Sequence, residues 1–152
     1  MRFLIREMEP RDCAVWAKMR AALWPDETAQ LHAAEIETLL TRADVWNFIA
    51  NTAEGDPAGF AEVALRPYAN GCETRPVAFL EGIWVEPRFR RQRLGAQLMA
   101  HIEAFLAARG FREIGSDALI DNRVSHAAHR AWGFSETERV VYFRKALDAP
   151  MR

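Results

Sequence analysis

The chain has 152 residues, of which 50% are hydrophobic, and its 20 basic and 21 acidic residues nearly balance. This length and composition predict a single α/β domain over residues 1–152, and they argue against a disordered chain and against the basic surface of a nucleic-acid-binding protein. No apolar run approaches the roughly 20 residues that span a bilayer, and the first residues lack the apolar core of a signal peptide, so we expect a cytoplasmic protein without a membrane partner.

The two cysteines, Cys13 and Cys72, have no spacing typical of a metal site. In a cytoplasmic protein, two thiols are more often free and reduced than bridged. We therefore expect free thiols and no metal ion.

The first half of the chain predicts a short strand, two helices and a hairpin. Leu23-Trp24-Pro25-Asp26 separates the helices, because a residue before proline disfavours the helical backbone. An aromatic side chain at such a joint is usually a core anchor, and facing a substrate is the less common role. The predicted elements are a strand over residues 3–6, helices from about 12 to 23 and 28 to 41, and hairpin strands over 45–50 and 59–65.

The apolar spacing of the two helices predicts which side of each is buried, since residues three and four apart share one helix face. The first helix has Val15, Met19, Ala22 and Leu23 on its apolar face, and the second has Leu31, Ile36, Leu39 and Leu40.

Residues 77–85 are rich in β-branched and aromatic side chains and predict the central strand, which Pro87 ends. Beyond it, apolar residues at helical spacing predict an amphipathic helix that runs to about Arg109 and ends at Gly110.

The last part of the chain predicts a strand over 111–116, a helix over about 124–132 and one or two strands over 138–145. Strand-to-helix crossovers occur only in the second half of the chain. The fold class is therefore predicted to be α/β, with a central mixed sheet flanked by about four helices.

Four arginines lie between the central strand and the amphipathic helix. Residues 90–96 lie at the N-terminus of that helix, where free backbone N–H groups and the positive end of the helix dipole attract anions. Arginine is normally unfavourable there, so the cluster makes sense if a polyanion such as a pyrophosphate neutralises it. The alternative is a solvated basic turn. The arginines are Arg88, Arg90, Arg91 and Arg93.

Two carboxylates are candidates for a cationic substrate. Glu81 interrupts the apolar central strand, so it must be paired, hydrogen-bonded or directed into a cleft, and a salt bridge with an arginine is the structural alternative. Asp117 follows the next strand, where ligand crevices form in α/β sheets, and its structural alternative is the cap of a turn. If both face one crevice, they can hold an amine and accept its proton, directly or through a water.

The sequence Val85-x-Pro87-x-Phe89-Arg90-x-x-Arg93-x-Gly95 follows the central strand. It resembles the acyl-CoA-binding motif of the GNAT superfamily of N-acetyltransferases, whose last glycine matches Gly95. At the middle glycine of the motif this chain has Arg93, for which we expect a backbone with negative φ and a side chain directed away from the pyrophosphate. The predicted order of strands and helices is also that of the GNAT fold.

Five further segments extend the resemblance over nearly the whole chain. They are Leu23-Trp24-Pro25-Asp26, Tyr68-x-Asn70-Gly71-Cys72, Phe79-Leu80-Glu81-Gly82-Ile83, Ser116-Asp117 with Asn122 after it, and Glu136-Thr137-Glu138-Arg139-Val140. Together they resemble the aminoglycoside 6'-N-acetyltransferases. The resemblance implies transfer of an acetyl group from acetyl-CoA to the 6'-amino group of aminoglycoside antibiotics, by direct attack of the amine on the thioester, and it implies a homodimer.

The resemblance also implies roles for individual residues. Trp24, Tyr68, Glu81, Asp117 and Glu138 would line the aminoglycoside site, with Glu81 and Asp117 as the catalytic carboxylates and Glu138 reaching the site of the neighbouring subunit. Ile83, Trp84 and Val85 would offer backbone to the pantetheine arm, Arg91, Gln92, Arg93, Leu94, Gly95 and Ala96 would hold the pyrophosphate, and Asn122 would contact CoA through its side chain.

Many GNAT enzymes have a tyrosine four residues before a Gly-Phe pair, placed to protonate the leaving thiolate, and this chain has His129 there. An imidazole could serve the same purpose, but we favour a packing role for this side chain. Two alternatives to the aminoglycoside function remain open at this level: acetylation of a polyamine or another cationic amine, and a CoA-binding domain without catalysis. Acidic pockets suit any polycation, and the departure at Arg93 supports the second alternative.

Overall fold

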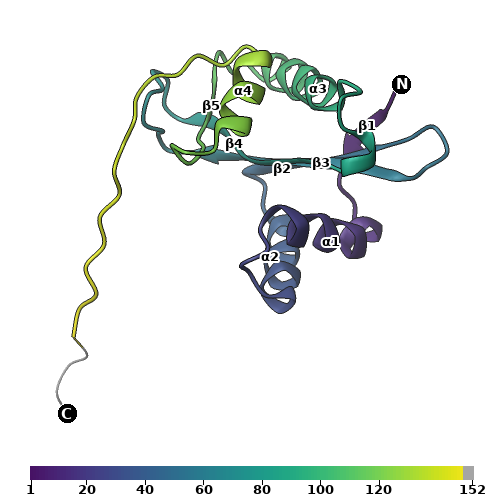
Figure 1. Cartoon of the computed structure of the whole chain (residues 1–152), viewed down its shortest axis with the longest axis horizontal. Helices are drawn as coiled ribbons and strands as arrows, with labels where there is room; N and C mark the ends of the chain where they lie inside the picture. The colour runs from purple at the N-terminus through teal and green to yellow at the C-terminus, as the bar shows by residue number, and fades with distance from the viewer. Residues whose placement is uncertain (149–152) are drawn as a thin grey trace.

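The computed structural model describes residues 1–148. It contains a five-stranded sheet with α1 and α2 on one face and α3 and α4 on the other (Figure 1). No helix in residues 1–148 combines the length and the apolar character that crossing a membrane requires. The elements are β1 (Leu4–Glu7), η1 (Pro10–Asp12), α1 (Cys13–Leu23), α2 (Ala29–Thr41), β2 (Val45–Asn51), β3 (Pro57–Arg66), β4 (Val77–Val85), η2 (Pro87–Phe89), α3 (Leu94–Ala108), β5 (Ile114–Ser116) and α4 (Arg123–Ala131).

The sheet is mixed, as the sequence predicted. Its strands lie in the order β1-β2-β3-β4-β5, and every neighbouring pair is antiparallel except β4 and β5. Those two strands run in the same direction because α3 carries the chain back across the sheet between them. The predicted fold class is confirmed.

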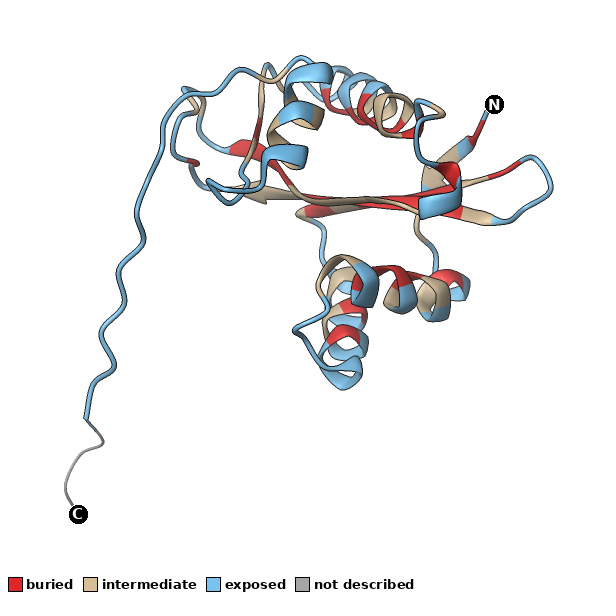
Figure 2. Ribbon diagram, in the orientation of Figure 1, coloured by how far each residue is buried: buried red, intermediate tan, exposed pale blue. Residues whose placement is uncertain are grey.

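The sheet separates two hydrophobic cores (Figure 2). Successive side chains of a strand point to opposite faces, so in β2 Phe48 packs on the α3 side and Ile49 on the α1 side. The α3 side contains Phe48, Leu94, Leu98, Met99 and Ile102, and the α1 side contains Trp16, Met19, Ile36, Ile49 and Phe60.

The predicted faces of α1 and α2 are confirmed in the main, since Met19 and Ile36 are buried and Val15, Leu23, Leu39 and Leu40 pack against them. The buried faces also contain polar residues that were not predicted. In α1, Trp16 and Arg20 are buried whereas Ala22 is exposed, and in α2, His32 is buried whereas Leu31 is 40% exposed. The polar side chains turn inward because a buried carboxylate on β3, Glu62, lies opposite them.

A buried ion pair joins the two helices to the sheet. Arg20 Nη1 donates to both oxygens of Glu62 at 2.5 and 2.6 Å, and Trp16 Nε1 donates to the same carboxylate at 2.9 Å. Arg20 Nε donates to His32 Nδ1 at 3.3 Å, which leaves His32 Nε2 to donate to the Trp24 carbonyl at 3.1 Å. Burial raises the pKa of Glu62, and Arg20 and Trp16 oppose that rise by stabilising the charged form.

The last described segment has no helix or strand after α4. Thr137 still lies against Gly71, and residues 138–148 run away from the body of the molecule as an extended arm (Figure 1), so the predicted strands over 138–145 are wrong for this structure. A strand exists only as part of a ladder, and within residues 1–148 the arm has no strand beside it to pair with.

Removing the charge of Glu62 is expected to destabilise the fold. In Glu62→Gln the Arg20 guanidinium stays buried without its counter-charge, which costs about 3–5 kcal/mol of unfolding free energy. Urea unfolding measures this difference. Glu37→Gln, at an exposed position of the same helix layer, is the matched control, and equal unfolding midpoints for the two variants would contradict the assigned role of the pair.

Candidate active site

A β-bulge in β4 sets the position of Glu81. Val63 of β3 pairs with Leu80, and the preceding residue, Glu62, pairs with Gly82, so Glu81 is the extra residue of β4. Gly82 carries no side chain, and a Cβ there would lie 2.5 Å from the Trp24 ring. The bulge and the glycine thus bring the carboxylate of β4 and the indole of the α1–α2 joint to one place.

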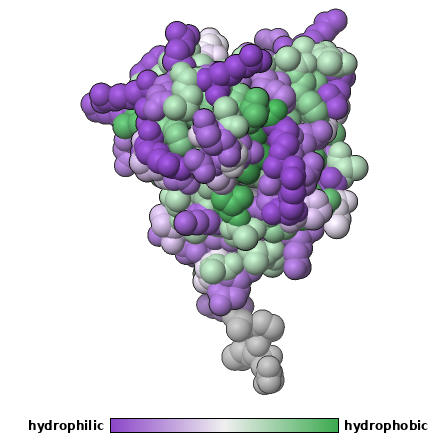
Figure 3. Space-filling view, turned by 90° about the vertical axis from the view of Figure 1, so that its right-hand side faces the viewer, coloured by the Kyte–Doolittle hydropathy of each residue, from purple (hydrophilic) through white to green (hydrophobic). Residues whose placement is uncertain are grey.

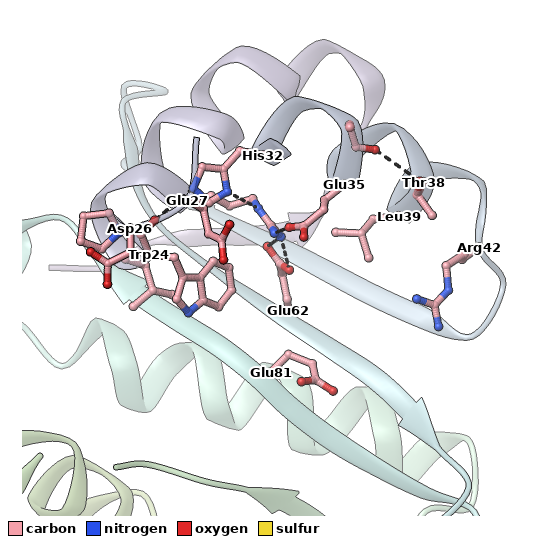
Figure 4. A pocket seen from close by; sticks show the side chains of 14 residues that line it. Trp24, Asp26, Glu27, His32, Glu35, Thr38, Leu39, Arg42, Glu62 and Glu81 are labelled. Atoms are coloured by element: carbon pink, nitrogen blue, oxygen red, sulfur yellow. Dashed lines mark hydrogen bonds and ion pairs between the residues drawn. The ribbon is translucent and has the colours of Figure 1, made fainter. Parts of the chain in front are cut away.

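A cavity of about 790 Å³ lies between this joint and the sheet (Figure 4). Its lining includes Arg20, Arg42 and more carboxylates than cationic groups. Arg20 is committed to Glu62 and Glu35, and Arg42 to Asp44 outside the lining. Within residues 1–148 two of the lining carboxylates have no ion-pair partner, so the cavity suits a cation. The lining carboxylates are Asp26, Glu27, Glu35, Glu62 and Glu81, and the two unpaired ones are Asp26 and Glu27.

Glu81 is paired with Arg66 at the edge of this cavity. Arg66 Nε and Nη2 donate to the two carboxylate oxygens at 2.8 and 2.7 Å, and the guanidinium lies 3.6 Å from the centroid of the Phe79 ring. The structural alternative for Glu81, a salt bridge with an arginine, is therefore what the structure contains. The pair is not deeply buried, because the side chains of Arg66 and Glu81 are 39% and 31% exposed.

Asp117 lies outside the cavity lining and makes no ion pair with Arg66. Ser116, the last residue of β5, pairs with Leu80 of β4. Asp117 follows Ser116 in the chain just as Glu81 follows Leu80. Glu81 raises the pKa of Arg66, and Asp117 adds to that rise at longer range. Of the two predicted carboxylates, only Glu81 pairs with Arg66, and Asp117 is exposed.

The other two predicted substrate residues are outside the cavity. Tyr68 is 59% exposed, with the Arg75 guanidinium 5.5 Å from its ring centroid. Glu138 lies on the exposed arm. Of the five predicted substrate residues, the structure places only Trp24 and Glu81 in the lining.

The C-terminal half of β4 has one edge without a partner strand. β5 pairs only with residues 78–80 of β4, so within residues 1–148 no strand lies on that side of Ile83, Trp84 and Val85. The backbone along this edge can bind an extended ligand, except that the Val85 carbonyl accepts a hydrogen bond from Arg90 Nε at 3.0 Å.

The turn between η2 and α3 has the geometry of an anion-binding loop. Arg91 and Arg93 have φ of 62° and 63°, in the left-handed region. Within residues 1–148 the backbone N–H groups from Arg91 to Ala96 have no hydrogen-bond acceptor. Alternating left-handed residues direct successive N–H groups into one concavity, and the N-terminus of α3 adds its positive dipole end.

The prediction of a negative φ for Arg93 is wrong. Its backbone has φ 63° and ψ 20°, the conformation that a glycine adopts without strain. A non-glycine residue there costs of order 1 kcal/mol, so the turn has a backbone shape that suits glycine and carries a charged side chain.

The four arginines divide into two pairs. Arg90 folds back over the Trp84 ring, 4.7 Å from its centroid, and Arg88 lies over Phe89 with its guanidinium 4.0 Å from Asp56. Arg91 and Arg93 are exposed and have no carboxylate partner within residues 1–148. Because they are exposed and unpaired in this part of the chain, Arg91 and Arg93 are the arginines available to an anion.

Hydrophilic residues cover much of the face of the molecule that carries the β2–β3 turn (Figure 3).

Gly95 and Asn122 bring α4 against the start of α3. A Cβ at Gly95 would lie 2.8 Å from the Trp132 ring, so the glycine gives this indole its space. Asn122 caps α4, since its Oδ1 accepts a hydrogen bond from the N–H of Ser125 at 3.1 Å. Its side-chain amide N–H groups stay available for another contact.

His129 has a packing role, as favoured above. Its ring lies 5.5 Å from Trp132 and 5.1 Å from Phe134 between centroids. Nδ1 donates to the Ser125 carbonyl at 2.7 Å, and Nε2 then accepts from the Ser116 hydroxyl at 2.7 Å. Both ring nitrogens are used within the fold.

Both cysteines are free, as predicted. Burial raises the pKa of the Cys72 thiol, and the negative charge of Glu113 adds to the rise. A thiol in this environment is less easily deprotonated, which disfavours it as a nucleophile.

The sequence analysis missed Arg66 and the buried network of Arg20, His32 and Glu62. Glu62 stands between apolar neighbours in β3, as Glu81 does in β4, and this signal could have found it. No local pattern identifies Arg66, because its partner lies 15 residues away and is met only across the β3–β4 pair.

Comparisons with known proteins agree with this geometry. The model of the acetyltransferase (GNAT) family matches residues 11–134. Two proteins named aminoglycoside N(6')-acetyltransferase type 1 are similar to this chain. That of Stenotrophomonas maltophilia is 46% identical, covering 95% of this chain and 94% of its own, and that of Serratia marcescens is 45% identical, covering 87% and 91%.

Solved structures agree as well. The aminoglycoside 6'-N-acetyltransferase AAC(6')-Ih from Acinetobacter baumannii has a TM-score of 0.89 at 38% identity, over 97% of this chain and 100% of its own. AAC(6')-Iy, in complex with the bisubstrate analogue CoA-S-monomethyl-acetylneamine, also has a TM-score of 0.89 at 38% identity, over 97% of this chain and 100% of its own. The chain therefore belongs to the acetyltransferase (GNAT) family and, within it, to the group of the aminoglycoside N(6')-acetyltransferases.

Proposed function

We propose that the protein transfers the acetyl group of acetyl-CoA to the 6'-amino group of aminoglycoside antibiotics and thereby confers resistance. The observation that carries the proposal is the arrangement along β4. An acidic cavity begins at the bulge, an unpaired strand edge continues from it, and a turn of free backbone N–H groups lies at the far end. A relative of known structure binds an analogue that joins CoA to an aminoglycoside fragment, which spans the same two kinds of site.

In this proposal the protein binds acetyl-CoA along the C-terminal half of β4. The N–H groups of residues 91–96 and the side chain of Arg91 hold the pyrophosphate. Because Arg93 has a positive φ and is exposed, we propose that its side chain also takes part, in place of the expected direction away from the pyrophosphate. Ile83, Trp84 and the edge up to Val85 hold the pantetheine arm by backbone hydrogen bonds, and the amide of Asn122 adds a side-chain contact.

The carboxylates hold the antibiotic so that one amine faces the thioester. The amine nitrogen bonds to the carbonyl carbon, the carbon–sulfur bond breaks, and CoA leaves as a thiolate that takes up a proton. Glu81 or Asp117 accepts the proton from the nitrogen, directly or through a water. Because an unprotonated amine is already a good nucleophile, close approach accounts for most of the rate enhancement, and no covalent enzyme intermediate is needed.

We further propose that a single catalytic domain works in the cytoplasm as a homodimer, with Glu138 reaching the partner's site. Support comes from the arm, whose apolar side chains have nothing to pack on within residues 1–148. Tyr142, Phe143 and Leu147 are 81%, 92% and 86% exposed. A row of such residues on a soluble protein marks an interaction surface.

A polyamine is the alternative acceptor, because the unpaired carboxylates Asp26 and Glu27 suit any polycation. The non-catalytic alternative loses its main support, since Arg93 lies in the left-handed region that a glycine adopts without strain, so the turn does not exclude an arginine at this position.

Incubation with acetyl-CoA and tobramycin is expected to release free thiol far above background, with spermidine acetylated more slowly. The assay follows thiol release, and mass spectrometry of the product locates the acetyl group. Absence of thiol release with tobramycin and kanamycin would contradict the proposed function, and faster turnover of spermidine would favour the alternative acceptor.

Glu81→Gln is expected to weaken aminoglycoside binding. The substitution removes the carboxylate that holds a substrate ammonium group and leaves the positive charge of Arg66 without its counter-charge beside the site, so KM is expected to rise. Steady-state kinetics at saturating acetyl-CoA measure the change. Glu37→Gln, an exposed carboxylate outside the cavity lining, is the control and should leave KM unaltered.

Two substitutions at Arg93 separate its charge from its backbone. Arg93→Ala removes the charge and keeps a left-handed non-glycine residue, whereas Arg93→Gly removes both the charge and the strain. Both should weaken CoA binding by calorimetry to a similar extent, and only Arg93→Gly should raise the unfolding free energy, by about 0.5–1 kcal/mol. Unchanged CoA affinity in both variants would show that the guanidinium does not contact the co-substrate.

A further inference from the structure

Arg66 forms an ion pair with Glu81, the carboxylate that binds the substrate amine in the proposed function. Both oxygens of Glu81 accept hydrogen bonds from the Arg66 guanidinium, at 2.8 and 2.7 Å. An ammonium group that enters the cavity therefore meets a carboxylate whose charge is already neutralised. We propose that Arg66 is a built-in counter-cation of Glu81, which an ammonium group of the antibiotic displaces on binding, so that Arg66 sets the substrate affinity of the site.

The exposure of the pair fits an exchangeable contact rather than a structural one. The side chains are 39% and 31% exposed, whereas those of the buried pair Arg20 and Glu62 are 6% and 7% exposed. Water and a ligand can reach both partners of the exposed pair. A partly exposed ion pair contributes little to folding, and the groups separate at small cost.

The surroundings of Arg66 give the displaced guanidinium a place to stay. It stacks on Phe79, 3.6 Å from the ring centroid, and this contact does not depend on Glu81. Asp117 makes no ion pair with Arg66, and its negative charge acts on the guanidinium only at longer range. Rotation of the outer part of the side chain therefore frees Glu81 while Arg66 keeps its stacking contact with Phe79.

The exchange makes the other carboxylates of the cavity important for affinity. At Glu81 one cation replaces another, so the net electrostatic gain is small. Further ammonium groups of the same molecule gain more, because Asp26 and Glu27 have no ion-pair partner within residues 1–148. A molecule with several ammonium groups thus binds despite Arg66, whereas a simple amine gains little at this site.

The inference rests on the proposed role of Glu81, and three variants of the full chain separate the two. Calorimetric titration with tobramycin, without acetyl-CoA, gives the dissociation constant for Arg66→Gln, Arg66→Lys and Glu81→Gln at several salt concentrations. The Arg66→Gln variant is expected to bind tobramycin about two- to fivefold more tightly than the unaltered protein. This ratio of dissociation constants corresponds to the small free energy of a partly exposed ion pair. Its affinity should also fall more steeply with salt, because the cavity gains a net negative charge.

Arg66→Lys keeps the charge without the two-pronged contact and should bind with intermediate affinity. Arg11→Gln removes a positive charge far from the cavity, where Arg11 pairs with Glu9, and serves as the control with unchanged affinity. If both Arg66 variants and Glu81→Gln all bind tobramycin more weakly, the inference about Arg66 is overturned while the proposed role of Glu81 stands. Arg66 would then hold Glu81 in place for the substrate. Unchanged binding by Glu81→Gln would overturn the role of Glu81 and the inference with it.

Discussion

The extra residue in β4 is the constraint on which the site depends. Pairing with β3 shifts by one residue at Glu81, and pairing with β5 stops at Leu80. Because a bulge disturbs the ladder and bends its strand, the same point in β4 turns a carboxylate toward the cavity and begins an edge without a partner strand. The acidic cavity and the strand edge proposed to bind the cofactor thus both begin at one irregularity in the sheet.

The two faces of the sheet contribute different parts of the site. The α3 face has an apolar core that fixes the start of α3, where Gly95 lies against Trp132. The α1 face has a buried polar network, in which Arg20 and His32 connect Glu62 to the joint that carries Trp24. A rigid core suits the pyrophosphate-binding role proposed for the turn, and a charged network suits the role proposed for the cavity wall in binding cationic substrates.

Several features of the site follow from local sequence. The central strand, the turn and the helix after it were predicted at nearly the right positions, because proline, glycine and apolar spacing act over a few residues. Glu81 was found for the same reason, as a carboxylate in an apolar run. The conformation of Arg93 was mispredicted, since a preference against positive φ is weak compared with the closure of the turn around it.

The sequence by itself determined the order of the elements, the mixed sheet and the motif of the turn before α3, all of which depend on neighbouring residues. Only the tertiary structure decided which polar groups meet. Arg66 reaches Glu81 across the β3–β4 pair, and Arg20 reaches Glu62 from a helix 42 residues away. It also decided that the arm after α4 forms no strand within residues 1–148, because a strand needs a partner and the sequence does not say whether its own chain provides one.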